Sequence, residues 1–197
     1  MKFIIATNNK HKVKEFQRIL SPLGIEVISQ SDAGINIDVV EDADSFEGNA
    51  YLKAKAIFDI SHIPTISDDS GLEVFALNNA PGVFSARYGG AGLTDIDRYN
   101  KLLDEMKNIP EDERGARFIC SISLVFSNVK SYSFTGVCQG KIGYQPKGQN
   151  GFGYDPVFMI GDESFSTLSP QKKDEISHRG KALRQMAEEL KNLKNNE

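Results

Sequence analysis

The hydrophobic and polar positions in the first half of the chain alternate between short apolar runs and helical stripes. The short runs predict strands at residues 2–6, 25–29, 35–40 and 64–67. Apolar residues three or four positions apart predict a helix after the first run, and further helices over 45–61 and 94–107. The stripes of the first and third helices are Val13, Phe16, Ile19 and Leu20, and Ile96, Tyr99, Leu102, Leu103 and Met106. Strands that alternate with helices in this way are typical of parallel βα units.

Two long runs of β-type residues occupy the middle of the chain, at 116–127 and 130–142. The short link between them predicts a hairpin, and therefore antiparallel pairing. A last helix is predicted over 177–194, with an inward stripe of Leu183, Met186, Ala187, Leu190 and Leu193. Together these patterns predict an α/β fold whose mixed sheet is flanked by helices. Since no repeat or long linker divides the sequence, we expect a single domain over 1–197.

The composition is that of an ordinary globular protein. Of the 197 residues, 40% are hydrophobic and 25% are charged, which argues against a disordered or fibrous chain. The formal net charge of −4 disfavours a nucleic-acid-binding protein, because that class needs a basic surface. A small polyanion could still bind where positive groups gather. No apolar run is long enough for a signal peptide or a membrane span, so we expect a cytoplasmic protein with no membrane partner.

The two cysteines, Cys120 and Cys138, both lie in apolar, strand-like stretches. Two cysteines cannot form a disulfide framework or a four-ligand zinc site. We therefore expect both to be small buried residues in a reducing compartment.

A candidate anion site lies in the turn that joins the first strand to the first helix, Thr7-Asn8-Asn9-Lys10-His11-Lys12. A helix N-terminus presents unpaired N–H groups and the positive end of the helix dipole. Thr7 and Asn9 can cap the helix or donate hydrogen bonds, and Lys10 and Lys12 add positive charge. The absence of a glycine-rich loop excludes a Walker A or dinucleotide motif. The alternative is an ordinary N-cap followed by solvated lysines.

Two adjacent carboxylates, Asp68 and Asp69, follow the run at 64–67. Ligands of open α/β sheets gather at the carboxyl ends of strands. Adjacent carboxylates repel each other unless a cation or a proton lies between them, and Mg²⁺ with phosphate oxygens commonly fills that place. Because side chains alternate along extended backbone, only one of the two should face any given site. The alternative is a solvated Asp-Asp-Ser-Gly turn.

Lys53 lies halfway along the core-facing stripe of the helix 45–61, together with Phe46, Ala50 and Ile57. A charge there is costly without a partner. Its stem could snorkel to water, or its ammonium could reach an anionic ligand. Glu41, one of three acids in four residues ahead of this helix, is a weak signal by itself.

Two further segments near the end of the chain carry candidate chemistry. Residues 148–156 contain three glycines, two aromatic residues and Asp155, a composition that suits close backbone approach, stacking and hydrogen bonds to a base. His178 and Arg179 open the last helix, at its positive end, where cations are unfavourable. A compensating anion or acceptor would explain them; the alternative is a surface arginine at a frayed helix start.

Six short motifs occur in a definite order. They are T-x-N-x-x-K at 7–12, a Glu ahead of N-A-x-x-K at 49–53, S-D-D-S-G-L at 67–72, P-G-x-x-S-A-R-Y at 81–88, G-F-G-Y-D-P at 151–156 and S-H-R-G at 177–180. In this order and spacing they resemble the inosine/xanthosine triphosphate pyrophosphatase family, over essentially the whole chain.

The resemblance implies roles for individual residues. The triphosphate would be held by Thr7, Asn8, Asn9, Lys10, His11, Lys12 and Lys53. Glu41 and Asp69 would bind the metal, Mg²⁺, and Asp69 would also orient or deprotonate the attacking water. The nucleotide would further contact Ser70, and its base would be bound by Phe152, Gly153, Tyr154 and Asp155, with Lys173, His178 and Arg179 closing the pocket over the purine 6-position. Arg87 would be a helper from a partner subunit or a mobile loop.

The resemblance also implies an activity and an architecture. The family hydrolyses non-standard purine nucleoside triphosphates (ITP, dITP, XTP) to the monophosphate and pyrophosphate, and is homodimeric, with an elongated mixed sheet and a nucleotide cleft between two lobes. Hydrogen-bond donors suit the 6-oxo group of these purines, and adenine would leave the donors unpaired. The alternatives are a related pyrophosphatase for modified pyrimidine or 7-methylated nucleotides, and a non-catalytic nucleotide-binding module.

Overall fold

The computed structural model describes residues 2–195, which form two compact units. Unit 1 comprises residues 2–69, 120–136 and 178–195, and unit 2 comprises residues 70–119 and 137–177. A seven-stranded sheet has the order β2-β1-β3-β4-β5-β6-β7, and β3 (Thr65–Val74), β4 (Gly115–Ser127) and β5 (Lys130–Ile142) each contribute residues to both units. The expected mixed sheet with flanking helices is confirmed. Residues 1, 196 and 197 of the expected single domain lie outside the described part.

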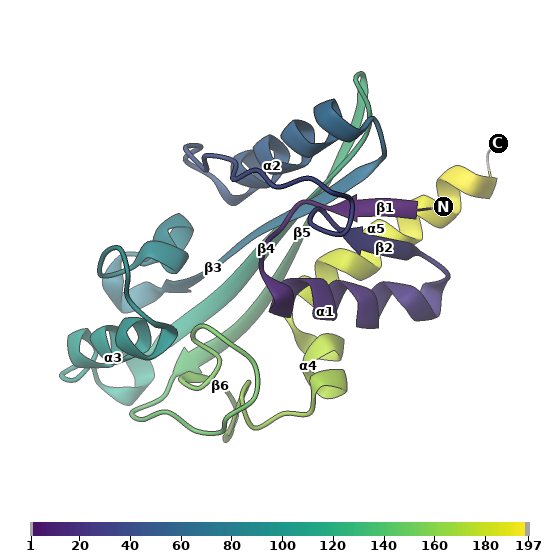
Figure 1. Cartoon of the computed structure of the whole chain (residues 1–197). Coiled ribbons are helices and arrows are strands. Elements are labelled where there is room, and N and C mark those ends of the chain that lie inside the picture. The colour runs from purple at the N-terminus through teal and green to yellow at the C-terminus, as the bar shows by residue number, and fades with distance from the viewer. Residues whose placement is uncertain (1, 196–197) are drawn as a thin grey trace. The chain divides into compact units, whose positions relative to one another are not determined.

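Unit 1 is built on parallel pairing of short N-terminal strands (Figure 1). Strand β1 (Lys2–Ile5) pairs in parallel with β2 (Glu26–Ser29) and with the start of β3, where Ile4 lies opposite Thr65. Its helices are α1 (Lys10–Leu20), α2 (Phe46–Ser61) and α5 (His178–Asn195), and the short 3₁₀ helix Ser21–Leu23 follows α1. Gly24 adopts φ +73° after that turn, a conformation that glycine reaches without strain.

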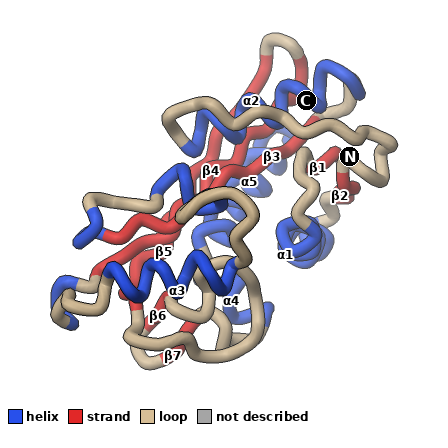
Figure 2. The backbone as a smooth tube through the Cα atoms, turned by 60° about the vertical axis from the view of Figure 1, so that its left-hand side comes forward, coloured by secondary structure: helices blue, strands red, loops and turns tan. Residues whose placement is uncertain are grey.

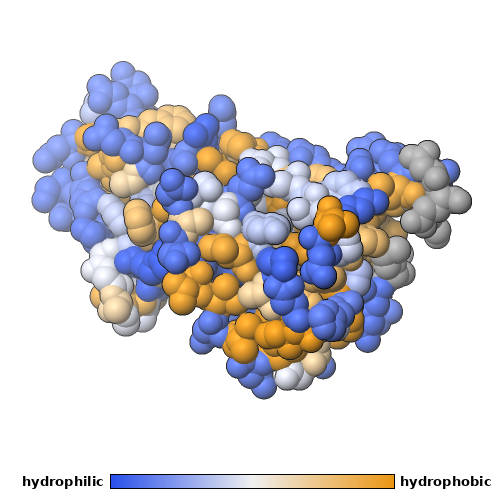
Figure 3. Space-filling view, turned by 90° about the horizontal axis from the view of Figure 1, so that it is seen from above, coloured by the Kyte–Doolittle hydropathy of each residue, from blue (hydrophilic) through white to orange (hydrophobic). Residues whose placement is uncertain are grey.

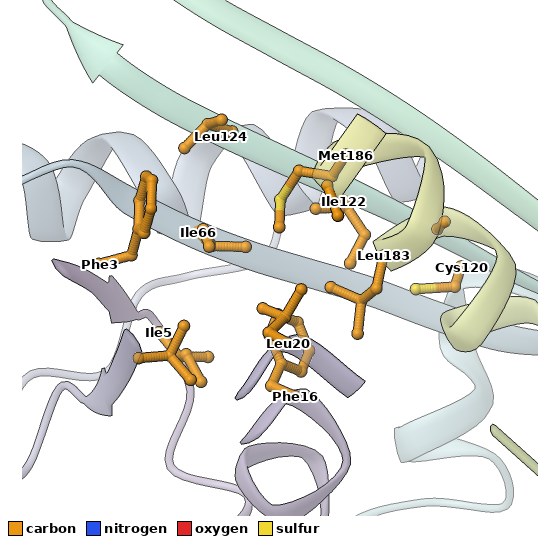
Figure 4. Close-up of a cluster of buried hydrophobic side chains, with 13 residues drawn as sticks. Phe3, Ile5, Phe16, Leu20, Ile66, Cys120, Ile122, Leu124, Leu183 and Met186 are labelled. Atoms are coloured by element: carbon orange, nitrogen blue, oxygen red, sulfur yellow. The ribbon is translucent and has the colours of Figure 1, made fainter. Parts of the chain in front are cut away.

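Because side chains alternate along the strands, the two faces of the sheet in unit 1 pack against different helices. Phe3 and Ile5 point to the face that α1 and α5 cover, where they pack with Phe16, Leu20, Leu183 and Met186 (Figure 4). Ile4 points to the opposite face and packs with Ile57 of α2. The predicted inward residues of the first helix, and those of the last helix up to Leu190, are therefore confirmed, since they are buried in this core or packed against it. Leu193 is half-buried and is not part of it.

Unit 2 contains short elements joined by long loops (Figure 2). They are α3 (Asp95–Glu105), α4 (Pro170–Ile176), β6 (Phe158–Ile160), β7 (Glu163–Ser164) and the 3₁₀ helices Phe75–Leu77, Gly82–Arg87 and Glu111–Glu113. Strand β6 pairs antiparallel with both β5 and β7. Three phenylalanines form the centre of its core: the Phe158 ring lies 4.6 Å from Phe118 and 4.9 Å from Phe165.

Several sequence predictions differ from the structure. Residues 35–40 form no strand, because their backbone bonds to Gln30 rather than to a neighbouring strand: Ile35 N–H donates to Gln30 O, and Gln30 Nε2 donates to Ile37 O. The solvated Asp-Asp-Ser-Gly turn is wrong, since β3 continues through these residues as one ten-residue strand. Ile96 is 57% exposed and does not face the core. The elements α4, β6 and β7 were not predicted.

The predictions of a central hairpin and of two buried cysteines are confirmed. The two long β runs form β4 and β5, neighbours in the sheet that a turn at Asn128 and Val129 connects. Cys120 and Cys138 are both buried and free. In residues 2–195 no helix has the length and apolar character needed to cross a membrane. Hydrophobic residues on the face drawn in Figure 3 lie in patches among hydrophilic ones.

Candidate active site

The turn at residues 7–12 is held by its own side chains. The Asn9 side chain caps α1, because its Oδ1 accepts hydrogen bonds from the His11 and Lys12 amides at 2.9 and 3.3 Å. Thr7 Oγ1 accepts from the Asn9 amide at 3.2 Å. The first turn of α1 contains no acidic residue, and Lys10 and His11 are exposed beside it. The turn is therefore a genuine N-cap, and it keeps a positive helix end open to solvent.

Two side chains of this turn reach other parts of unit 1. Asn8 Nδ2 donates to Asp38 Oδ1 at 2.8 Å, which joins the turn to the loop ahead of α2. Lys12 does not extend into water: its side chain is 15% exposed, and Nζ lies 3.1 Å from Asp68 Oδ2. The alternative of solvated lysines is thus wrong for Lys12.

Asp68 and Asp69 point to opposite faces of β3, as the alternation of an extended strand predicts. Asp68 faces α5, and its Oδ2 accepts from Nε and Nη2 of Arg179 at 3.1 and 2.8 Å. Asp69 faces α2, and its Oδ2 accepts from Asn49 Nδ2 at 3.2 Å. Asp68 and Asp69, although adjacent in the sequence, therefore accept hydrogen bonds from different side chains.

Arg179 is buried among carboxylates rather than frayed at the surface. The residue is 1% exposed, and its Nη1 donates to Glu15 Oε2 at 2.5 Å. The surface-arginine alternative is wrong, and the compensating anions are Asp68 and Glu15. Burial by itself would raise the pKa of Asp68, but the charges of Lys12 and Arg179 outweigh it and hold that pKa well below 3.8.

Glu15 was not predicted from the sequence. A signal exists: Glu15 lies three residues after Lys12 on α1, directly before the core residue Phe16. Its buried carboxylate is the partner that lets a cation occupy the start of α5.

The other acid cluster in unit 1 gathers around the ammonium of Lys53. Lys53 Nζ contacts Glu41 Oε1 and lies 3.7 Å from Asp69 Oδ1. The lysine side chain is only 13% exposed, so it does not snorkel to bulk water. One cation thus lies between the two carboxylates that the resemblance assigns to a metal.

Burial and charge shift the pKa values of this cluster in predictable directions. Burial raises the pKa of Asp69, and Lys53 and Lys12 offset this only in part, so the net shift is upward from 3.8. Burial would lower the pKa of Lys53, but Asp69, Asp68 and Glu41 outweigh it and raise that pKa above 10.5. Lys53 is therefore positively charged at neutral pH.

The donor set of this cluster fits a hard divalent cation. Glu41 and Asp69 offer carboxylate oxygens on either side of a position that already attracts positive charge. Mg²⁺ needs few protein carboxylates, because water and substrate phosphates complete its shell. Within residues 2–195, no group of three or more His, Cys, Asp or Glu side chains is arranged to hold a metal.

The loop at 148–156 forms a separate cluster in unit 2. Asp155 Oδ2 accepts from the Phe152 amide at 3.0 Å and from Lys173 Nζ at 2.6 Å. The same ammonium lies 5.0 Å from the centre of the Phe152 ring and 5.6 Å from that of Phe165, within cation–π range. Asp155 therefore fixes both its own loop and Lys173.

Further contacts anchor the loop at its aromatic end. Tyr154 is 4% exposed, and its hydroxyl donates to Ser85 O at 2.9 Å. The Gly153 amide donates to Asp95 Oδ2 at 2.7 Å. Tyr154 is thus fixed in the core of unit 2, whereas Phe152 remains partly exposed.

The remaining candidates divide between the two units. His178, 4% exposed, opens α5 in unit 1, where the helix backbone lies directly against Gly136 of β5. Ser70 lies in β3 as the first residue of unit 2. Arg87 ends a 3₁₀ helix in unit 2, with its guanidinium 5.8 Å from the centre of the Phe84 ring. The structure therefore gathers the expected phosphate and metal residues in unit 1 and most of the expected base residues in unit 2.

A family model described as the Ham1 family matches residues 3–189. The chain belongs to the Ham1 family. A protein named dITP/XTP pyrophosphatase from Desulfotalea psychrophila is 45% identical over 188 residues, which cover 94% of this chain and 83% of that protein. A protein of the same name from Clostridium perfringens is 42% identical over 98% of each chain. A solved Ham1 structure from Coxiella burnetii aligns with a TM-score of 0.88 and 37% identity, over 98% of this chain and 99% of that one.

The Ham1 match spans both clusters. Its limits, residues 3 and 189, enclose the turn at 7–12, the acid cluster around Lys53, the loop at 148–156 and the start of α5. Since coverage is nearly complete in the relatives and the solved structure alike, the Ham1 fold accounts for this chain from strand β1 to helix α5.

Proposed function

We propose that this chain hydrolyses non-canonical purine nucleoside triphosphates (dITP, ITP and XTP) to the monophosphate and pyrophosphate. Membership of the Ham1 family and relatives named dITP/XTP pyrophosphatase support the substrate class. The observation that carries the catalytic part is the position of Lys53 between Glu41 and Asp69, since a module that only binds nucleotides has no need of this acid pair.

The triphosphate is assigned to unit 1. Its roughly four negative charges need local cations in a protein whose net charge is −4. The capped N-terminus of α1 offers amides and the positive end of its dipole, and Lys12 and Lys53 add ammonium groups beside it. Lys10 and His11 are exposed and available at the same turn.

Glu41 and Asp69 would hold the metal, for which Mg²⁺ is the proposed ion. When bound, it would polarise the phosphate group under attack. The task left to the protein is to orient a water molecule, and Asp69 is the candidate: its second oxygen is held by Asn49, and burial raises its pKa, which makes it a stronger base than an exposed aspartate. No covalent intermediate is required in this scheme.

The base is assigned to the cluster of unit 2, and the sequence resemblance adds His178 of unit 1 as a further contact. Phe152 offers a partly exposed ring for stacking, and Lys173 and His178 are donors suited to a 6-oxo group. Three N–H groups of Arg179 already donate to Asp68 and Glu15. We therefore assign Arg179 a positioning role, in which it holds the start of α5 that carries His178.

Three further expectations belong to this proposal. Residues 1–197 act as one nucleoside-triphosphate pyrophosphatase domain, the protein is a homodimer, and it works in the cytoplasm. The homodimer rests on the sequence resemblance and would be checked by sedimentation analysis, and the location would be checked by fractionation of the source cells.

A product assay with a nucleotide panel tests the activity. The protein would be incubated with Mg²⁺ and ITP, dITP, XTP, GTP, ATP, a modified pyrimidine triphosphate or a 7-methylated nucleotide, with Asp69→Asn as the inactive control. We expect monophosphate and pyrophosphate from the first three, and little from ATP. Release of orthophosphate, or preference for the modified or methylated nucleotides, would contradict the proposal. Tight nucleotide binding without turnover would favour the non-catalytic module.

A further inference from the structure

We propose that Asn49 is a positioning residue that holds Glu41 and Asp69 in the arrangement needed to bind a metal. The inference rests on the proposed function, which makes Glu41 and Asp69 the metal ligands. Asn49 itself is not among the site residues that the sequence predicted. Asn49 lies in the first turn of α2, is 1% exposed, and uses both ends of its amide: Oδ1 accepts from the Ala43 amide at 3.0 Å, and Nδ2 donates to Asp69 Oδ2 at 3.2 Å.

The contact with Ala43 restrains the segment that carries Glu41. Residues 35–43 have no regular secondary structure, so strand or helix hydrogen bonds do not fix them. Ala43 lies two residues after Glu41, and its amide is tied to the Asn49 side chain. A carboxylate on a segment of this kind would otherwise lose its position through backbone motion.

Close packing at the start of α2 strengthens this restraint. This packing is separate from the cap of the helix, in which Ser45 Oγ accepts from the Gly48 amide at 3.1 Å. A Cβ at Gly48 would lie 2.7 Å from the Ala43 Cβ, which is too close for two carbon atoms. The segment before α2 therefore folds tightly onto the first helical turn, and Asn49 is the side chain that joins it to β3.

The contact with Asp69 selects which of its oxygens is presented. Asn49 occupies Oδ2, and Oδ1 is the oxygen that lies 3.7 Å from Lys53 Nζ, on the side of Glu41. The donor is a neutral amide, so it orients the carboxylate without neutralising it. Asn49 thereby fixes both the segment that carries Glu41 and the rotation of the Asp69 carboxylate.

This arrangement gives Asn49 the position of an outer-shell partner to the carboxylates that would bind the metal. Mutation of such partners typically lowers metal affinity by about 10- to 100-fold. We therefore expect Asn49→Ala to weaken Mn²⁺ binding about tenfold or more, measured by electron paramagnetic resonance on the nucleotide-free protein. The Mg²⁺ concentration for half-maximal turnover of ITP should rise in parallel, with the KM for ITP at saturating Mg²⁺ changed much less.

Ser45→Ala is the matched control. It removes a hydrogen bond at the same helix end, but Ser45 makes its cap with Gly48 and none with Asp69. Both variants should lower stability toward urea, whereas only Asn49→Ala should weaken Mn²⁺ binding. Equal weakening in the two variants, or Mn²⁺ binding by Asn49→Ala at the wild-type level, would overturn the proposal, as would a wild-type protein that binds no Mn²⁺.

A second variant covers the case in which Asn49→Ala does not fold. Asn49→Asp keeps the size and the acceptor for the Ala43 amide, but it replaces the donor to Asp69 with a second carboxylate, which repels Asp69 while both are ionised. We expect a folded protein whose kcat for ITP at saturating Mg²⁺ falls about tenfold; a kcat within twofold of the wild type would contradict the inference. If the wild type lacks pyrophosphatase activity but the Mn²⁺ results hold, the proposed function fails and the positioning role stands.

Discussion

Arg179 donates from two of its nitrogens, Nε and Nη2, to the same oxygen of Asp68, at 3.1 and 2.8 Å. This ion pair joins the first turn of α5 to strand β3. Asp68 is the residue directly before Asp69 in that strand. The guanidinium also bonds to Glu15, so α1, β3 and α5 meet at one buried cation. The network that fixes Asp68 therefore also fixes the backbone that carries the proposed catalytic aspartate.

Arg179→Met should destabilise the protein strongly. Removal of the guanidinium takes a cation away from two buried carboxylates, Asp68 and Glu15, and leaves Lys12 as an ion-pair partner of Asp68. Breaking a buried ion pair from one side typically costs about 3–5 kcal/mol. Urea unfolding measures the loss, and Arg184→Met, an exposed arginine on the same helix, is the control. Equal unfolding midpoints for Arg179→Met and the wild type would contradict the structural role.

Stability should also fall in acid, in part because of Asp68. Its folded-state pKa lies well below the unfolded value of 3.8, so its contribution is present above pH 3.8 and is lost as the pH falls further. Urea midpoints between pH 7 and pH 2.5 would show the decline. Asp68→Asn should be less stable at pH 7 and should lose less on acidification. A parallel pH dependence in the two proteins would show that Asp68 contributes nothing to the decline.

The parts of the fold that the sequence predicted are those governed by local periodicity. The stripe that contains Phe16 and Leu20 predicted the buried face of α1, and alternation predicted that Asp68 and Asp69 would separate. Both are properties of a single element, so the spacing of residues along the chain suffices to find them.

The parts that were missed depend on partners distant in the sequence. Arg179 finds Glu15 at a separation of 164 residues, and no local pattern reports such a pairing. Residues 35–40 have strand-like composition, but Gln30 bonds two of their backbone groups: its carbonyl accepts from Ile35 N–H, and its side chain donates to Ile37 O. Asn49 was seen only as part of a motif, because its role requires Ala43 and Asp69 to be near it at once.

Lys53→Met should weaken substrate binding and shift the pH profile. The variant loses the ammonium proposed to contact phosphate, so the KM for ITP should rise about tenfold, the ordinary value of one charge-assisted contact. Lys53 is also the largest influence that lowers the pKa of Asp69, so the acid limb of the pH–rate profile should move to higher pH. The control is Lys55→Met, which removes a lysine of α2 paired with Asp59. An unchanged KM and acid limb would remove Lys53 from the site.

Asp69→Asn should abolish turnover without lowering the Tm at neutral pH. Burial raises the folded-state pKa of Asp69 above 3.8, so its ionised form is less favourable in the folded protein than in the unfolded chain. That cost is incurred as the pH rises from 3.8 through the raised pKa, and a neutral amide avoids it. Asn49 can still donate to the new side chain. Thermal unfolding and ITP turnover check the two parts, and wild-type turnover would remove Asp69 from the mechanism.

Gly136→Ala should displace the start of α5 and with it His178. A Cβ at Gly136 would lie 2.1 Å from His178 O and 2.7 Å from Ala182 N, and backbone atoms cannot move aside as a flexible side chain can. Gly143→Ala is the control, because its Cβ would meet the flexible Met159 side chain at 3.2 Å and Gln145 O at 3.5 Å, an ordinary van der Waals distance. We expect Gly136→Ala to lose about 1–3 kcal/mol of stability and to show a lower ratio of kcat/KM for ITP over ATP. If both variants unfold at the same urea concentration, the close approach of α5 to β5 is not a constraint on the fold.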